Sequence, residues 1–123
     1  MSDPTKELGR EGERLAAEYL ARAGYVILAR NYRARSGELD LIAKEGDTLV
    51  FVEVKTRRAG AAVGPFEAVT RAKRRQMARV ALDYLTRSGE GEQPARFDVV
   101  AVTFGKGEPF VELMKNAFGL DEG

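Results

Sequence analysis

Hydrophobic and polar positions along the chain change their spacing several times, and each change marks an expected element. From Pro4 to Ala23, apolar side chains recur every three or four residues, which predicts an amphipathic helix. We expect Asp3 to cap this helix at its start and Gly24 to end it. The stretch from Thr70 to Thr86 has the same period and predicts a second helix with Thr70 as its cap.

The rest of the pattern is typical of strands. Two runs of alternating apolar residues flank the turn residues Glu45-Gly46-Asp47, which predicts a β-hairpin. Residues 59–65 are small and Gly-rich, so we expect a loop there. Strands are expected at residues 25–33, near 37–44 and 48–57, at 96–104 and at 109–113. The order α-β-β-β-α-β(-β) favours an α/β fold with a mixed central β-sheet flanked by helices.

Composition narrows the class of protein and of site. The 123 residues suit one domain, with flexible ends expected at 1–3 and 119–123. No apolar run approaches the ~20 residues of a membrane helix, and no secretory signal opens the chain, so we expect a cytoplasmic protein without membrane contact. The chain has no Cys, His or Trp. This excludes zinc fingers, thiol nucleophiles and Ser-His-Asp triads, and leaves oxygen ligands that suit Mg²⁺ or Mn²⁺.

The predicted hairpin carries the candidate chemistry. Along its second strand Phe51, Glu53 and Lys55 share a face, because side chains alternate in a strand. A two-residue turn at Glu45-Gly46 would place Glu38 opposite Glu53, and one at Gly46-Asp47 would place Asp40 there. Either turn puts Asp40, Glu53 and Lys55 on one side, with Leu39, Leu41 and Ala43 on the other. A three-residue turn would break this arrangement unless a bulge restored it.

Two carboxylates about 5 Å apart repel by on the order of 3 kcal/mol at an effective dielectric constant near 20. A divalent cation or a neighbouring lysine relieves this repulsion, and Lys55 is two residues from Glu53. Mg²⁺ is commonly held by one or two carboxylates with phosphate oxygens and waters. Asp40, Glu53 and Lys55 are therefore candidate catalytic residues for phosphodiester hydrolysis. The alternative is that they are solvent-facing residues, with Lys55 simply paired with Glu53.

This pattern resembles the PD-(D/E)xK nuclease superfamily, in which an acidic residue on one strand precedes (D/E)xK on the next. More closely, the chain is similar to the YraN family of small bacterial endonuclease-like proteins, which resemble Holliday junction resolvases. The matching stretches are GREGERLAAEYLARAGYVILARNYR, GELDLIA, FVEVKTRR and RFDVVAV. The resemblance implies a restriction-endonuclease-like core and a metal site formed by Asp40, Glu53 and Glu13. Lys55 would be the lysine of the motif. Apart from the resemblance, Glu38 is a candidate neighbour of the metal or hydrogen-bond partner.

Positive charge is concentrated in the middle of the chain. Residues 54–88 contain nine basic and two acidic side chains, a net charge of +7, between acidic flanks. Such a segment is typical of a surface that binds a polyanion, although a solvated helix face would have the same composition. We expect four arginines to share one helix face, while Lys73, one residue off that face, could turn toward the carboxylates. The candidate nucleic-acid-binding residues are Arg57, Arg58, Arg71, Lys73, Arg74, Arg75 and Arg79, with Arg71, Arg74, Arg75 and Arg79 on the common face.

Together these features predict an endonuclease that depends on Mg²⁺ or Mn²⁺ and hydrolyses phosphodiester bonds in nucleic acid. DNA, branched or otherwise structured, is the favoured substrate, and the resemblance to resolvases leaves a homodimer open. One alternative is a nucleic-acid-binding module on a nuclease fold that does not cut. Another is a protein-interaction or dimerisation subunit whose arginines bind an acidic partner.

Overall fold

The computed structural model describes residues 4–89 and 92–119. Asp3, the expected helix cap, and the expected flexible ends lie outside these residues, apart from Gly119. The elements are α1 (Pro4–Arg22), β1 (Val26–Ala34), β2 (Gly37–Glu45), β3 (Thr48–Arg58), α2 (Arg71–Ser88), β4 (Ala95–Phe104) and β5 (Phe110–Phe118). This order confirms the predicted α/β fold. The last strand is longer than expected, because it pairs along most of β4.

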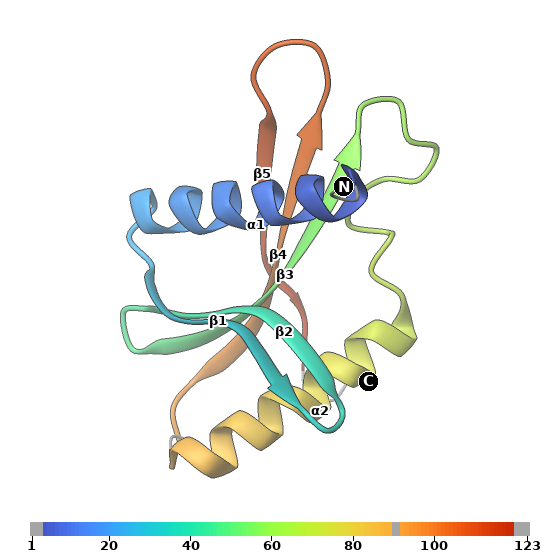
Figure 1. Cartoon of the computed structure of the whole chain (residues 1–123). Helices are drawn as coiled ribbons and strands as arrows, with labels where there is room; N and C mark the ends of the chain where they lie inside the picture. Colours follow the sequence, from blue (N-terminus) through green and yellow to red (C-terminus); the bar gives the residue numbers. More distant parts are fainter. Residues whose placement is uncertain (1–3, 90–91, 120–123) are drawn as a thin grey trace.

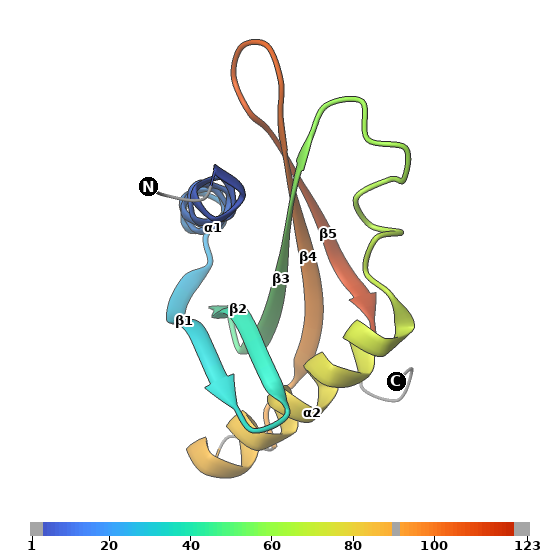
Figure 2. The ribbon, with the colours of Figure 1, turned by 45° about the vertical axis from the view of Figure 1, so that its right-hand side comes forward.

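The five strands form one mixed sheet in the order β1-β2-β3-β4-β5. Only β3 and β4 are parallel, and the other neighbours are antiparallel. A parallel pair needs a crossover connection, and the segment containing α2 supplies it. Helix α1 covers one face of the sheet and α2 the other (Figures 1 and 2). Neither helix in the described parts of the chain is long and apolar enough to cross a bilayer.

Strand β3 is buried on both faces because a helix covers each of them. Val50, Val52 and Val54 pack in the cluster that includes α1. Phe51 packs in the cluster that includes α2, and Glu53 follows it on the same face. The apolar run around Glu53 therefore places a carboxylate inside the protein, only 5% exposed.

The predicted alternation in β2 is wrong at one position. Leu41 and Ala43 face α1 as a pair, but Leu39 packs with the α2 cluster. The break falls beside Asn31 of β1, which lies opposite this part of β2. Asn31 has a left-handed backbone conformation, with a φ of 52°. The tip of the β1–β2 hairpin lies beside α2 (Figure 2).

Two close contacts fix where the helices lie on the sheet. A Cβ atom on Gly12 of α1 would lie 2.1 Å from Oγ1 of Thr56 on β3, so the helix passes directly over the strand. A Cβ atom on Gly37 would lie 2.3 Å from Nε2 of Gln76, and Gly37 has a φ of 145°. The hairpin tip therefore lies directly on α2.

A second buried carboxylate, Asp98 on β4, has a structural role. It accepts hydrogen bonds from the hydroxyl of Tyr25 at 2.8 Å, Nε of Arg96 at 2.9 Å and the backbone N–H of Asn116 at 2.9 Å. These donors offset the cost of burying its charge. Because they come from three separate segments of the chain, Asp98 links those segments.

Candidate functional site

The site begins where β2 and β3 stop pairing. The turn of the β2–β3 hairpin consists of Gly46 and Asp47, one of the two turns that the sequence left open. With this register, Asp40 and Glu53 occupy facing positions one step beyond the last pair of the ladder. There the carboxylate of Asp40 accepts a hydrogen bond from the backbone N–H of Val54 at 2.7 Å. This bond fixes one oxygen of Asp40 beside Glu53.

Glu53 is buried, and its pKa is strongly shifted. Its Oε2 lies 3.6 Å from Nζ of Lys73, while its Oε1 is buried without a hydrogen-bond partner. Burial, and then the neighbouring Asp40 carboxylate, raise the pKa of Glu53 to about 8. The positive charges of Lys73 and Lys55 oppose this rise but do not cancel it. A buried carboxylate with one unsatisfied oxygen is a candidate ligand for a cation.

Glu13 approaches from the other side of Asp40, because α1 crosses the sheet closely at Gly12. Burial and the charges of Asp40 and Glu38 raise the pKa of Glu13. With its amide oriented to satisfy hydrogen bonding, Asn31 donates to Oε2 of Glu13 and to Oε1 of Glu38, each at 3.2 Å. Asn31 therefore links two of the predicted acidic residues.

The structure brings the four predicted acidic residues into one region, but it does not form a complete metal cage. Within residues 4–89 and 92–119, no three acidic side chains converge closely enough to hold a metal ion. Asp40 and Glu53 are adjacent, whereas Glu13 lies beyond Asp40, and Glu38 is bound by Arg33 at 3.2 Å. A two-carboxylate arrangement suits Mg²⁺, which usually takes its other ligands from phosphate oxygens and water.

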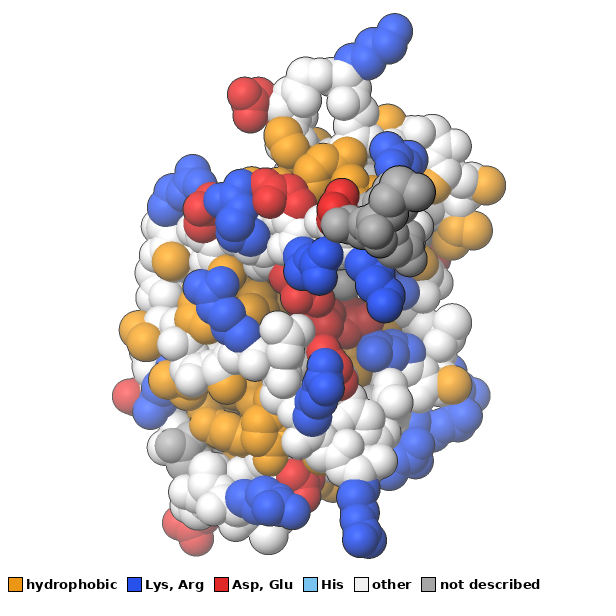
Figure 3. All heavy atoms as spheres, viewed as in Figure 1, with side chains coloured by type: hydrophobic (Ala, Val, Ile, Leu, Met, Phe, Trp, Pro, Cys, Tyr) orange, Lys and Arg blue, Asp and Glu red, His pale blue; other side chains and the backbone are white. Residues whose placement is uncertain are grey.

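Basic side chains surround the acidic region. Figure 3 shows red acidic side chains near the centre of one face, with blue Lys and Arg side chains around them. One cleft of about 180 Å³ contains Glu13 and Asp40 together with Arg10 and Arg30. The sequence alone did not point to these two arginines or to Asn31 as site residues. The signal that could have indicated them is their place in GREGERLAAEYLARAGYVILARNYR, the first stretch of the family resemblance. Their proximity to Asp40 has no local signal, because they are distant from it in the sequence.

Two further predicted residues lie at the end of β3. Lys55 and Arg57 line a hollow of about 370 Å³ beneath the loop that follows the strand. Nη2 of Arg57 donates to the carbonyl of Ala61 at 3.0 Å, which ties that loop to the strand. Arg58 is exposed. Lys55 thus lines this hollow, and its positive charge acts on Glu53.

The prediction of four arginines on one face of α2 is wrong for Arg74. Arg71, Arg75 and Arg79 are exposed. The side chain of Arg74 instead donates to the carbonyl of Val69 at 3.3 Å and lies over the ring of Phe118. A helix turns by about 100° per residue, so neighbouring positions 74 and 75 face different surroundings. Lys73 does turn toward the carboxylates, as expected.

Comparison with known proteins places these residues in a family. Residues 12–102 match the model of the uncharacterised protein family UPF0102. The chain is 52% identical over 119 residues to a UPF0102 protein of Anaeromyxobacter dehalogenans, covering 97% of this chain and 89% of that one. It is 53% identical over 115 residues to a UPF0102 protein of Symbiobacterium thermophilum, covering 93% and 98%. A Geobacter metallireducens relative is 48% identical over 120 residues, covering 98% of both chains.

Proposed function

The chain belongs to the UPF0102 family, and from its acidic site we propose that it is a divalent-metal-dependent endonuclease. The bond broken is the phosphodiester P–O bond of a nucleic acid, with DNA as the favoured substrate. Water attacks phosphorus and loses a proton, the bond from phosphorus to the leaving sugar oxygen breaks, and that oxygen takes up a proton.

The observation that carries this proposal is the buried carboxylate of Glu53 beside Asp40. Its Oε1 has no hydrogen-bond partner, and Asp40 adds a second negative charge. An uncompensated buried charge costs several kcal/mol, so the pair is stable in ionised form only with added positive charge. Lys73 supplies part of that charge from 3.6 Å. A divalent ion bound by Asp40 and Glu53 would supply the rest.

The donor chemistry fits Mg²⁺ or Mn²⁺. The chain contains no His or Cys, so its available protein ligands are oxygen atoms, which these hard cations prefer. Asp40 and Glu53 would hold the ion, and Glu13 would contact it if its side chain moved toward Asp40. Such an ion stabilises the negative charge that develops on a phosphate during hydrolysis.

The remaining side chains would bind and orient the substrate. Lys73 and Lys55 flank Glu53 and would stabilise charge on the phosphate oxygens. Arg10 and Arg30 share the cleft of Asp40 and would bind adjacent phosphates of the strand. The exposed arginines of α2 would bind the backbone at a distance from the reacting bond, without reading the sequence of bases.

Cleavage of labelled DNA tests the proposal directly. Blunt duplexes, duplexes with single-stranded ends and four-way junctions would be incubated with Mg²⁺, Mn²⁺ or EDTA. We expect cleavage only with metal, and a loss of at least 100-fold in the Asp40→Asn and Glu53→Gln variants. DNA affinity measured in EDTA should survive in both variants. Glu108→Gln is the matched control, because Glu108 is an exposed acid in the β4–β5 turn.

Cleavage that persists in both acidic-site variants would contradict the proposal. Failure to cut any of these substrates with either ion would also contradict it. The second result would favour a nucleic-acid-binding module that does not cut. One observation favours that alternative: no third acidic side chain converges with Asp40 and Glu53 in the described part of the chain. Metal-independent, salt-sensitive DNA binding would then be the whole activity.

A further inference from the structure

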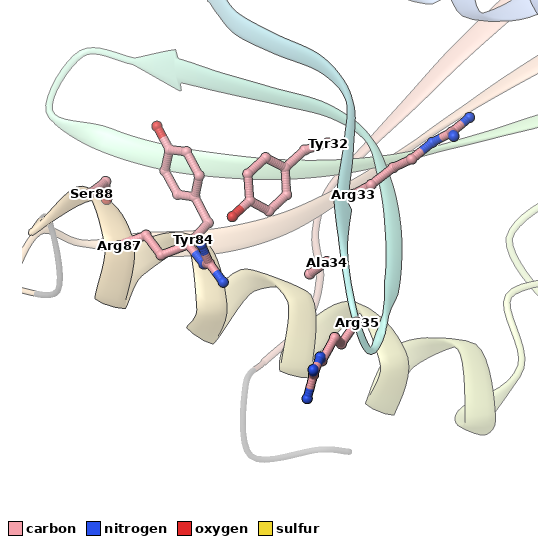
Figure 4. Close-up of a pocket in the computed structure, with 7 residues that line it drawn as sticks. All are labelled: Tyr32, Arg33, Ala34, Arg35, Tyr84, Arg87 and Ser88. Carbon is pink, nitrogen blue, oxygen red and sulfur yellow. The ribbon is translucent and has the colours of Figure 1, made fainter.

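A second cleft lies on the other side of the β1–β2 hairpin tip from the acidic site. It has a volume of about 700 Å³ and opens between the hairpin and the last turns of α2. Figure 4 shows Tyr32 of β1 beside Tyr84 of α2, with Arg35 and Arg87 extending at the cleft's edge. This cleft shares no residue with the cleft of Glu13 and Asp40.

The aromatic wall of this cleft is held in place by the core. The rings of Tyr32 and Tyr84 meet edge to face, with centroids 5.4 Å apart. Tyr84 also packs edge to face on the buried Phe51 at 5.9 Å. The hydroxyl of Tyr32 donates to Asp83 at 2.8 Å. Because both rings are already fixed, a planar ligand packed against them would cost little further side-chain entropy.

The edge of the cleft is positively charged. Arg35 is exposed, and no carboxylate of residues 4–89 or 92–119 lies within ion-pair distance of it. Arg87 is paired with Asp83 at 3.1 Å, but its side chain is 77% exposed. An exposed ion pair of this kind is weak, so a phosphate can compete for the arginine. The cleft thus combines an apolar aromatic wall with the exposed guanidinium of Arg35 and that of Arg87, which is held in an exposed ion pair.

The hairpin tip connects this cleft to the acidic site. Arg33 and Ala34 line both this cleft and a hollow that contains Glu38 and Lys73. In Figure 4 the side chain of Arg33 points away from the two tyrosines. From Asp40 to Gly37, where β2 meets the turn of the β1–β2 hairpin, the strand extends roughly 10 Å. A few nucleotides of one strand are long enough to span this distance.

We propose that the Tyr32–Tyr84 cleft binds unpaired nucleotides of a strand whose neighbouring phosphates occupy the acidic site. A base would pack against the tyrosines, and Arg35 and Arg87 would bind its phosphate. The inference rests on the proposed function for its nucleic-acid partner, and it narrows the substrate to a duplex with a single-stranded extension. An acidic peptide would supply negative charge for the arginines, but it would not supply a planar ring for the tyrosines beside each charged group.

Equilibrium binding in EDTA tests the cleft without requiring cleavage. Fluorescence anisotropy would compare a blunt duplex with the same duplex carrying six unpaired nucleotides at either the 3′ or the 5′ end. We expect the wild-type protein to bind one extended duplex at least fivefold more tightly. Arg35→Glu should abolish that preference. Lys106→Glu is the matched control, with the same charge change in the β4–β5 turn at the opposite end of the molecule (Figure 1); it should retain the preference.

Equal affinity for blunt and extended duplexes would overturn the inference, as would a preference that Arg35→Glu leaves intact. Adenosine monophosphate provides a separate arm, because a free nucleotide has the same chemistry. If Arg35→Glu weakens its binding while no preference for the extension exists, the cleft binds free nucleotides and the strand proposal is wrong. Absence of any DNA binding by the wild-type protein would contradict the proposed function as well, whereas equal binding would contradict only the role of the cleft.

Discussion

Glu53 of β3 meets Lys73 of α2 at 3.6 Å, yet the second carboxylate oxygen of Glu53 is buried without a hydrogen-bond partner. The lysine therefore compensates the carboxylate only in part. Burial and the adjacent Asp40 accordingly keep the pKa of Glu53 high, at about 8.

The raised pKa of Glu53 predicts a pH-dependent stability of the metal-free protein. Between its ordinary value of 4.5 and about 8, the folded state holds a proton that the unfolded state releases. Stability therefore falls as pH rises through this window, by about 1.4 kcal/mol per pKa unit at most. Glu53→Gln should remove this contribution and be the more stable protein at pH 8 in urea unfolding. At pH 4 the two should be closely similar, and parallel pH profiles from pH 4 to 8 would contradict the assignment.

Metal binding should depend on the same two carboxylates. Mn²⁺ at millimolar concentration should raise the melting temperature of the wild-type protein, more at pH 8 than at pH 6, because the ion competes with the proton on Glu53. EDTA should reverse the shift. Asp40→Asn and Glu53→Gln should abolish it, while Glu13→Gln should reduce it less, since Glu13 does not converge with the pair. An equal shift in Asp40→Asn would exclude this site.

The arginines of α2 should separate into two groups. Arg75→Ala and Arg79→Ala should each lower the salt dependence of DNA binding by about one unit of slope, with stability changed by less than about 0.5 kcal/mol. Arg74→Ala should instead lower the free energy of unfolding by about 1 kcal/mol, because it loses its contacts with Val69 and Phe118. Its DNA binding should stay near wild type. Weaker binding in Arg74→Ala than in Arg79→Ala would contradict this division.

Two glycines of α1 should respond in opposite ways to alanine. Gly12→Ala would place a methyl group against Thr56 and force α1 away from β3, at a cost of about 1 to 3 kcal/mol. A Cβ atom on Gly9 would meet nothing within 4 Å, so Gly9→Ala should stabilise the helix by up to about 1 kcal/mol. Chemical denaturation measures both. If Gly12→Ala were neutral, α1 would not approach the strand as closely as the structure shows.

Local patterns predicted much of the frame. Thr70 caps α2 as expected, its hydroxyl accepting a hydrogen bond from the backbone N–H of Lys73 at 3.1 Å. The two-residue turn at Gly46-Asp47 follows one of the expected registers. Capping, turns and strand alternation depend on neighbours in the chain, so the residue order is sufficient to predict them. The same alternation placed Glu53 and Lys55 on one face of the strand.

The errors and omissions share one cause. Leu39 changes face where Asn31 takes a left-handed conformation on another strand. Arg74 leaves the expected arginine face because Phe118, from the end of the chain, lies beneath it. The helical period already separates positions 74 and 75. It gives no sign that Phe118 lies beneath Arg74 or that β1 changes conformation beside Leu39, because these depend on which segments pack together.

The residue order by itself therefore determined the elements, their order and the acidic and basic side chains that they carry, since these follow from short-range periodicity. Only the tertiary structure decided that Glu53 is buried with an unsatisfied oxygen, that Lys73 contacts it, and that Arg10 and Arg30 share the cleft of Asp40. Burial and electrostatic coupling arise from distances between segments far apart in the chain. Those distances exist only once both helices have packed on the sheet.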